Sequence, residues 1–348
     1  MSGSSDAERQ GRREASAKAI LTSGIPLEMA VYDLLASGLD ADWIEPECEF
    51  TSLDQTGTPI QRSVDFVSSI PTSRNPLDER SIQLYLLTEC KYCAPNETIW
   101  VFMPDMSPRM RGVFDDWRPA LWQDREPHEH RSDAEIARIM EGQAPSSPDK
   151  GLAPRCVRGA PLGVAGSDAP ERARGKQQRR LPALSTALHQ LRDCLHHLAT
   201  ERFRLFTKQW SQPAALVFVP VLVTNAEMRM LKPGIHERLL AMSRDDQPAL
   251  DDVATIEQRV LLRCPSSLDQ VDWKWHRFYL AHGGHDLSRV EKGLPAYKRE
   301  RTIEAHLRNF FTTTPGYVMV VRVEEAKKLL AEVVDWAKSL EFRPTDNG

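Results

Sequence analysis

Hydrophobic and polar positions divide the chain into segments of helical and strand type. Apolar side chains recur at helical spacing over residues 26–37, after a proline and before a glycine, which predicts an amphipathic helix. Residues 43–53, 60–70 and 81–91 are mainly apolar, and turn-forming residues separate the first two segments. This pattern predicts a hairpin followed by a third strand.

The pattern continues with one long break. Residues 97–103 predict a further strand, leucines recurring through residues 184–207 predict a long helix, and the apolar run 214–224 predicts a strand covered on both faces. Residues 141–180 are rich in Gly, Pro, Ala and Ser, and then in Arg. We expect a flexible insertion there.

The remaining third of the chain has weaker patterns. Strands are expected at 259–263, 273–280 and 317–323, and helices at 302–311 and 324–340. The expected organisation is a disordered tail at 1–18, an α/β core at 19–225 interrupted by the flexible insertion 141–180, and an extension of the same body at 226–348.

Composition narrows the class of protein. The 348 residues are 41% hydrophobic and carry a formal net charge of −4. No stretch of 18 apolar residues and no signal-peptide core are present, so we expect a cytoplasmic protein without a membrane partner. The charge argues against a generic nucleic-acid coat but not against a nuclease, because a local basic patch suffices. Basic groups at 172–180 and 298–301 are candidates, with a solvated surface as the favoured alternative.

Two carboxylates and a lysine carry the strongest chemical signal. Asp65 lies within an apolar strand segment, and Glu89 lies at the end of the next one, two residues before Lys91. Residues two apart in a strand share a face, so Glu89 and Lys91 point the same way. Buried acids are costly unless a partner compensates them, and a divalent cation relieves the repulsion between two of them. Two acids and a lysine on one sheet face suit metal-assisted phosphodiester hydrolysis.

This pattern resembles the PD-(D/E)xK, or restriction-endonuclease-like, nuclease superfamily. Asp65 matches the first acid of the motif, Glu89 and Lys91 match the triplet, and Glu28 matches the acid of the first helix. Val64 stands where the motif has its nominal proline. The resemblance covers roughly residues 20–225. It implies a restriction-endonuclease-like mixed sheet flanked by helices, here with a flexible insertion and a C-terminal α/β extension.

The resemblance also implies chemistry. Asp65, Glu89 and the carbonyl of Cys90 would hold Mg²⁺, with Mn²⁺ as a substitute, while Lys91 assists the attacking water and Glu28 supports the site. The implied activity is that of a DNA endonuclease in restriction, defence or repair, with RNA as an open alternative substrate and with a homodimer or a partner subunit as possible assemblies. Two alternatives stay open: a catalytically silent nuclease-like subunit that binds nucleic acid or assembles with others, and an unrelated α/β protein whose strand acids are structural.

Other motifs carry weaker signals. Cys90 and Cys93 form a C-x-x-C without a second pair, so zinc is disfavoured. Gln83 and Tyr92 are candidates for supporting groups of the site, with a purely structural role favoured. Three histidine-bearing sets could hold a metal, although a solvated surface is favoured for each: His128–His130, His189 with Asp193 and His197, and His282–Asp286.

Overall fold

A computed structural model of the chain describes most of its regular elements. The described residues are 10, 13–16, 19–20, 23–39, 41–53, 58–71, 82–93, 98–105, 120–123, 154–163, 184–206, 215–235, 250–263 and 317–339. The helices are α2 (Ile25–Asp33), which runs on into a π-helical turn η1 (Leu34–Gly38), α5 (Leu184–Phe206), α7 (Leu250–Val253) and α10 (Val323–Ser339). The strands are β1 (Trp43–Leu53), β2 (Pro59–Pro71), β3 (Ile82–Lys91), β4 (Thr98–Pro104), β5 (Ala120–Gln123), β6 (Arg155–Gly163), β7 (Ala215–Thr224), β8 (Glu227–Leu231), β9 (Ala254–Glu257), β10 (Arg259–Arg263) and β11 (Tyr317–Arg322).

The described strands form one mixed sheet in the order β1-β2-β3-β7-β11-β10-β6-β4-β8-β9, with β5 paired to the first half of β7. Strands β1, β2 and β3 form an antiparallel meander. Strand β7 pairs in parallel with β3 over its whole length, from Ile82↔Ala215 to Lys91↔Thr224. An α/β protein with a mixed sheet flanked by helices is therefore confirmed.

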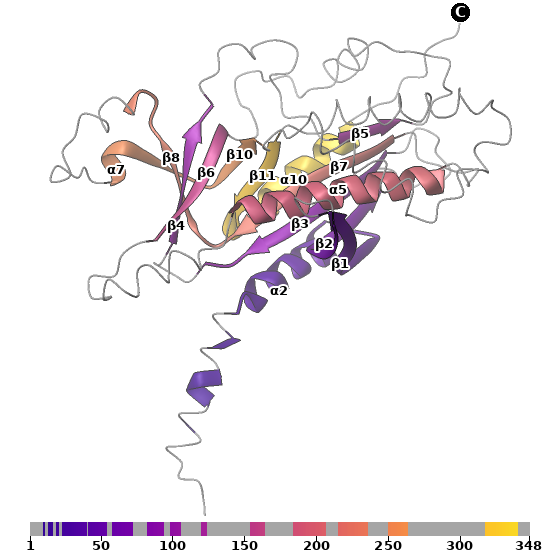
Figure 1. The fold of residues 1–348 in the computed structure, drawn as a ribbon, viewed down its shortest axis with the longest axis horizontal. Coiled ribbons are helices and arrows are strands. Elements are labelled where there is room, and N and C mark those ends of the chain that lie inside the picture. Colours follow the sequence, from indigo (N-terminus) through magenta and orange to yellow (C-terminus); the bar gives the residue numbers. More distant parts are fainter. Residues whose placement is uncertain are drawn as a thin grey trace, which may run out of the picture.

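Helices cover both faces of this sheet (Figure 1). On one face, α5 buries its leucines against a core cluster that includes Tyr85 and Leu87 of β3. On the other face, α2 and α10 pack on a second cluster that includes Leu84 and Leu86 of the same strand. The apolar positions of α10 recur every three or four residues, which gives it one continuous buried stripe. Successive side chains of β3 thus alternate between the two apolar clusters on opposite faces of the sheet.

Most of the expected elements are present with small shifts at their ends. The hairpin, the third strand, the long helix, the strand that follows it and the elements at 259–263 and 317–340 are confirmed. Strands β5, β8 and β9 were not expected. The segments 273–280 and 302–311 lie outside the described residues. Within the expected disordered tail at 1–18, the described residues, Gln10 and 13–16, are exposed and helical.

The flexible insertion expected at 141–180 is wrong for residues 155–163, which form strand β6 between β4 and β10. The small residues that suggest flexibility have a packing role there. A Cβ on Gly159 would lie 2.6 Å from Leu184 Cδ2 and 2.7 Å from Phe102 Cε1. Glycine is present because α5 and β4 approach the backbone closely.

The division at residue 225 does not separate two regions of space. Strands β4 and β6 come from the expected core range, yet they pair with β8 and β10 from the expected extension. Strand β11 lies between β7 and β10 and joins the two halves of the sheet. The C-terminal elements are thus built into the centre of the sheet.

Candidate active site

The predicted acids and lysine meet where β2 and β3 separate. The last pair between these strands is Phe66↔Thr88, and the residues just beyond it are Asp65 and Glu89. The backbone N–H of Cys90 donates a hydrogen bond of 2.5 Å to Asp65 Oδ2. This bond bridges the two strands after their regular pairing ends and fixes the position of the Asp65 carboxylate.

Glu89 is the most deeply buried acid of this site. The residue is only 1% exposed, and its Oε1 accepts a hydrogen bond from the Lys91 ammonium, as expected for side chains two apart in a strand. Its other oxygen, Oε2, is buried and has no well-formed hydrogen bond among the described residues. A buried carboxylate oxygen without a well-formed hydrogen bond is costly, and it is a ready ligand for a cation or an acceptor for a hydrogen-bond donor.

The pKa values of Glu89 and Asp65 reflect an excess of negative charge at the site. Burial raises the pKa of Glu89 to about 7, and the charge of Asp65 adds to the effect, while Lys91 and the nearby backbone amide of Asp65 offset part of it. Burial also raises the pKa of Asp65, against the hydrogen bond from Cys90 and the charge of Lys91. One lysine does not balance these acids, so a bound cation would stabilise their charged forms.

Both strands of the hairpin change their orientation at this point. On β2, Val64 enters the core under α5 and Phe66 enters the core under α2 and α10, although residues two apart normally share a face. The partner strand changes in the same place: Pro46 pairs with Phe66 and Cys48 pairs with Val64, which leaves Glu47 opposite Asp65. Asp65 therefore sits at a local distortion of the sheet edge.

Glu47 is the site residue that the sequence did not reveal. Its φ of 48° is the one positive φ among the described non-glycine residues. Such a conformation costs free energy in a residue with a Cβ, and strained residues of this kind cluster at functional sites. Its charge raises the pKa values of both Asp65 and Glu28, so its carboxylate lies within electrostatic reach of the two acids.

Glu28 reaches the site from the first turn of α2. Its pKa is raised by burial first, then by the charges of Asp65 and Glu47, and it is lowered by Lys91. The turn is preceded by Gly24 at φ 78°, whose carbonyl accepts the backbone N–H of Glu28 at 3.1 Å. The structure thus brings Glu28, Asp65, Glu89 and Lys91 into one electrostatic cluster.

Residues after β7 hold the end of β3. Thr224 Oγ1 donates a 2.8 Å hydrogen bond to the Lys91 carbonyl. The Asn225 amide binds the backbone of Cys93 twice, accepting from its N–H at 2.7 Å and donating to its carbonyl at 2.8 Å. These contacts fix the chain that carries Lys91.

Gln83 and Tyr92, the two candidates for supporting groups of the site, lie in different parts of the structure. Gln83 donates to Ser69 Oγ six residues before Glu89 on β3, so it is remote from the acids. Tyr92 packs against the apolar cluster beneath α2 and lies next to Gly24. Of the two, Tyr92 alone adjoins the site, through packing.

The donor set suits a hard cation that prefers oxygen. Asp65 and Glu89 supply carboxylates from adjacent strands. The N–H and C=O of one strand residue face the same neighbouring strand, so the Cys90 carbonyl also faces β2, beyond the last β2–β3 pair. No group of three or more Cys, His, Asp and Glu side chains is already drawn together as a metal cage within the described part of the chain. Two carboxylates with a carbonyl and waters fit the sparse coordination that Mg²⁺ accepts.

The cysteines of the C-x-x-C pair are poor thiolate ligands in this setting. Burial and the charges of Asp65 and Glu89 raise the pKa of the Cys90 thiol well above its usual range. Burial raises the pKa of Cys93 to about 11. Both thiols therefore stay protonated at neutral pH, which disfavours zinc.

Asp193 on α5 is held by a network of its own. It accepts a 2.6 Å hydrogen bond from Ser52 and contacts the guanidinium groups of Arg62 and Arg192. The nearby His189 has a lowered pKa, first because of burial and then because of Arg192. This part of the helix is thus an arginine–aspartate cluster. The motifs at His128–His130 and His282–Asp286 and the basic groups at 172–180 and 298–301 lie outside the described residues.

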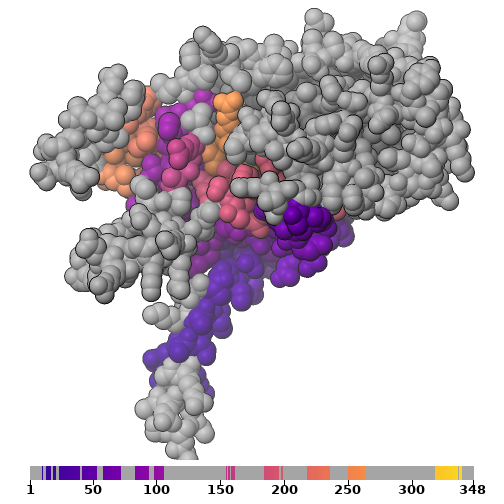
Figure 2. Space-filling model, viewed as in Figure 1, coloured from indigo at the N-terminus to yellow at the C-terminus, as the bar shows by residue number. Residues whose placement is uncertain are grey.

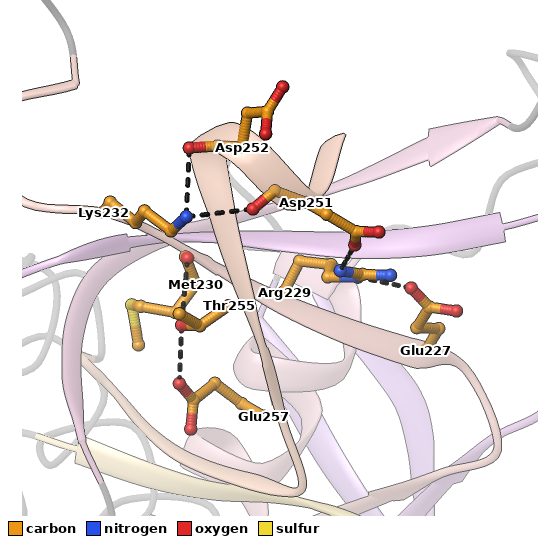
Figure 3. A network of polar contacts seen from close by, with 8 residues as sticks. All are labelled: Glu227, Arg229, Met230, Lys232, Asp251, Asp252, Thr255 and Glu257. Atoms are coloured by element: carbon orange, nitrogen blue, oxygen red, sulfur yellow. Dashed lines mark hydrogen bonds and ion pairs between the residues drawn. The ribbon is translucent and has the colours of Figure 1, made fainter. Parts of the chain in front are cut away.

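A second polar network lies at the opposite end of the sheet (Figure 3). Arg229 of β8 bridges Glu227 and Asp251, and Lys232 donates to the backbone carbonyls of Asp251 and Asp252. These contacts tie the short helix α7 to strand β8, which lies next to the edge strand β9. Glu227 and Asp251 are both paired with Arg229, so the network is structural and differs from the acid-rich site.

Comparisons with known proteins found no relative. A scan against protein-family models, a search of curated proteins and a search of solved structures each returned no match. No described helix has the length and apolar character needed to cross a bilayer. The functional argument therefore rests on the geometry and chemistry of the acid cluster.

Proposed function

We propose that the chain is a metal-dependent phosphodiester hydrolase, and specifically a Mg²⁺-dependent DNA endonuclease. The observation that carries this proposal is that Oε2 of Glu89 is buried without a well-formed hydrogen bond, beside Asp65 and Lys91. A structural ion pair alone explains neither this poorly satisfied oxygen nor a second acid in the same place. A cation that binds both carboxylates accounts for both features.

The arrangement of elements supports the same proposal. Strands β1, β2 and β3 form a meander, α5 leads from one side of the sheet to β7, and β7 pairs in parallel with β3. With β4, β5 and β6 inserted between β3 and α5, the chain follows the order of helix (α2), three strands, helix and strand that the resemblance to the restriction-endonuclease-like superfamily implies. The distortion at Asp65 also fits a first acid that bends its strand.

Each residue has a defined task in this proposal. Asp65, Glu89 and the Cys90 carbonyl would hold Mg²⁺ or Mn²⁺. Such a cation lowers the pKa of a bound water and offsets the charge that develops on a phosphate during hydrolysis. The ion pair with Glu89 holds Lys91 beside the proposed cation site, where it orients the attacking water or neutralises charge on the phosphate. Glu28 adds negative charge at the mouth of the site and helps to retain the cation.

The test is cleavage of plasmid and single-stranded DNA with Mg²⁺ or Mn²⁺. We expect metal-dependent cutting by the wild type and a loss of at least about a hundredfold in Lys91→Ala and Asp65→Ala, because each removes a group that acts on the reacting phosphate. Asp251→Ala is a matched control, since this acid lies in the remote network of Figure 3. It should cut at the wild-type rate.

Two outcomes would contradict the proposal. Equal cutting by all variants would identify a contaminating enzyme. Absence of cutting on DNA and RNA, together with nucleic-acid binding, would instead favour a catalytically silent binding subunit. RNA cleavage without DNA cleavage would keep the hydrolase and change its substrate.

A further inference from the structure

Helix α2 has apolar side chains on both of its sides. Leu27 and Val31 are buried against the sheet, in the apolar cluster that α2 shares with α10. Ile25, Met29 and Tyr32 lie on the opposite side, where they are 48%, 62% and 44% exposed. Their spacing of four and three residues places them along one face of the helix, which we call the α2 stripe. A helix that is apolar on both sides is normally covered on both, so the α2 stripe suits a contact with a partner.

The α2 stripe lies where a partner can reach it. Figure 1 shows α2 extending below β1, β2 and β3, and Figure 2 shows its indigo surface protruding from the body of the molecule. The Tyr32 ring packs on Phe66 of β2, with the two centroids 6.1 Å apart, so one end of the stripe is held against the sheet. The stripe is about 10 Å long, which is small beside the roughly 800 Å² that each partner of a stable interface buries. It therefore suits a short segment of a partner and not a broad interface.

The border of the α2 stripe is acidic. At about 100° per residue, Glu28 and Asp33 fall on the two sides of the stripe. Residues 19–61 include eight Asp and Glu residues and no Lys, Arg or His. Lys91 is within electrostatic reach of Glu28, but it is paired with Glu89. Helix α10, which packs beside α2, carries four acids and three lysines, so it does not neutralise this negative charge.

This charge decides which occupant fits the α2 stripe. A second copy of the chain in a two-fold contact would bring the same face together twice and would place acids against acids. A nucleic-acid backbone and an anionic membrane surface would be repelled for the same reason. A protein segment whose apolar face is bordered by Lys and Arg matches both the stripe and its border.

We propose that the α2 stripe binds an amphipathic, basic segment of a partner protein. Its apolar side chains would cover Ile25, Met29 and Tyr32, and its Lys or Arg side chains would lie beside Glu28 and Asp33. Glu28 also belongs to the acid cluster, so the partner would lie next to the candidate site. This inference goes beyond the proposed function and does not depend on hydrolysis.

The experiment measures binding of labelled helical peptides of about 18 residues to the full chain by fluorescence anisotropy, without divalent cations. One peptide has Leu along one face and Lys elsewhere, the second has Glu in place of Lys, and the third has Ser in place of Leu. We expect the Leu–Lys peptide to bind at least about tenfold more tightly than the other two, because both its apolar face and its positive charge are needed. Its affinity should fall as the salt concentration rises.

Substitutions on α2 test the two parts of this surface separately. Met29→Ser removes the most exposed side chain of the α2 stripe and should weaken binding of the Leu–Lys peptide about tenfold. Ile25→Ser should act in the same direction. Asp33→Asn removes one charge from the border, so it should weaken binding about threefold and reduce the dependence on salt.

Matched controls come from the opposite end of the sheet. Ile256→Ser removes an exposed apolar side chain of β9, and Asp252→Asn removes an exposed acid of α7. Both variants should bind the Leu–Lys peptide as the wild type does. Thermal unfolding of each variant identifies any that fails to fold, and Ile25→Ser then carries the test in place of Met29→Ser.

Several results would overturn the proposal. Absence of binding by the Leu–Lys peptide, or equal binding of the Leu–Lys and Leu–Glu peptides, would show that the surface does not select a basic amphipathic segment. Wild-type affinity in folded Met29→Ser and Ile25→Ser would place the peptide elsewhere. Self-association of the chain that Met29→Ser abolishes, measured by sedimentation equilibrium, would identify a second copy as the occupant. None of these results bears on the cleavage test of the proposed function, so the two proposals fail separately.

Discussion

Single side chains set the electrostatics of the candidate site, and Glu89 has the largest effect. It is buried at the end of β3 with one oxygen on Lys91 and one oxygen without a well-formed hydrogen bond. Burial, and then the charge of Asp65, raise its pKa to about 7, from an ordinary value of 4.5, although Lys91 acts in the opposite direction. In the absence of a cation, the charged form of Glu89 therefore opposes folding.

The first prediction concerns Glu89→Gln and pH. The folded state holds the Glu89 proton more tightly than the unfolded state, so the stability of the wild type without metal falls as pH rises from about 4.5 to about 7. A shift of about 2.5 pH units corresponds to at most roughly 3 kcal/mol. Glu89→Gln cannot ionise and should lack this loss. Chemical denaturation at pH 5 and pH 8 in EDTA measures it.

The matched control is Glu49→Gln, which removes an exposed acid from β1. It should follow the wild-type dependence on pH. Parallel stability curves for Glu89→Gln and the wild type would contradict the assignment of the raised pKa to Glu89.

The second prediction concerns the backbone of Glu47. A positive φ is strained for a residue with a Cβ and free of strain for glycine. Glu47→Gly and Glu47→Ala both remove the carboxylate, so their difference isolates the backbone. We expect Glu47→Gly to be more stable than Glu47→Ala by about 1 kcal/mol in the free energy of unfolding. Equal stabilities would show that the strand relaxes to an ordinary conformation.

Secondary-structure elements show how far the sequence could predict this protein. Alternating or continuous apolar runs predicted the meander and β7, because burial on one or both faces imposes those patterns. Strand β6 was missed because its glycines and prolines resemble a flexible segment, and the close approach of α5 and β4 that requires Gly159 is a tertiary contact.

The sequence likewise predicted only part of the candidate site. Asp65, Glu89 and Lys91 stood out because charged groups in apolar strands need an explanation. Glu47 did not, since it alternates with buried positions like an ordinary solvent-facing residue and its φ is invisible in the sequence. The contact of Arg62 with Asp193 joins residues 131 positions apart (193 − 62) and has no local signal.

The third prediction tests the packing of β6. Gly159→Ala would place a methyl group within 2.8 Å of both Phe102 and Leu184, in contact with a ring and a helix that are themselves buried. We expect a loss of about 1–3 kcal/mol in the free energy of unfolding. Gly38→Ala is the control, since its nearest atom is the end of the Leu34 side chain at 3.1 Å and it should change stability much less. Equal effects would contradict close packing at β6.

At the scale of the whole molecule, the proposed binding of a cation would link the site to global stability. The net charge of the chain is −4, and three further acids, Glu28, Glu47 and Glu89, gather with one lysine around Asp65. A ligand that binds only the folded state raises its free energy of unfolding by RT ln(1 + [L]/Kd). Mg²⁺ would therefore stabilise the entire sheet through the middle of β2 and the end of β3.

The fourth prediction measures this linkage. At a Mg²⁺ concentration about a hundred times its Kd, the free energy of unfolding should rise by about 2.7 kcal/mol. Asp65→Asn should abolish most of the gain, because it removes one of the two carboxylates proposed to hold the cation. Asp251→Asn changes an exposed acid in the remote network and should keep the gain. An equal gain in Asp65→Asn would place the cation elsewhere.

The place of β11 has a consequence for how the protein is made. Residues 317–322 join β7 to β10, so a ribosome must synthesise more than nine-tenths of the 348 residues before the two halves of the sheet can meet. Until then the second half of β7 and the facing edge of β10 are unpaired and open to association with other chains. Premature termination before residue 317 would leave the acid cluster on a sheet that ends at β7. Such a product is a target for chaperones and proteases, so the candidate site persists only in chains that include β11.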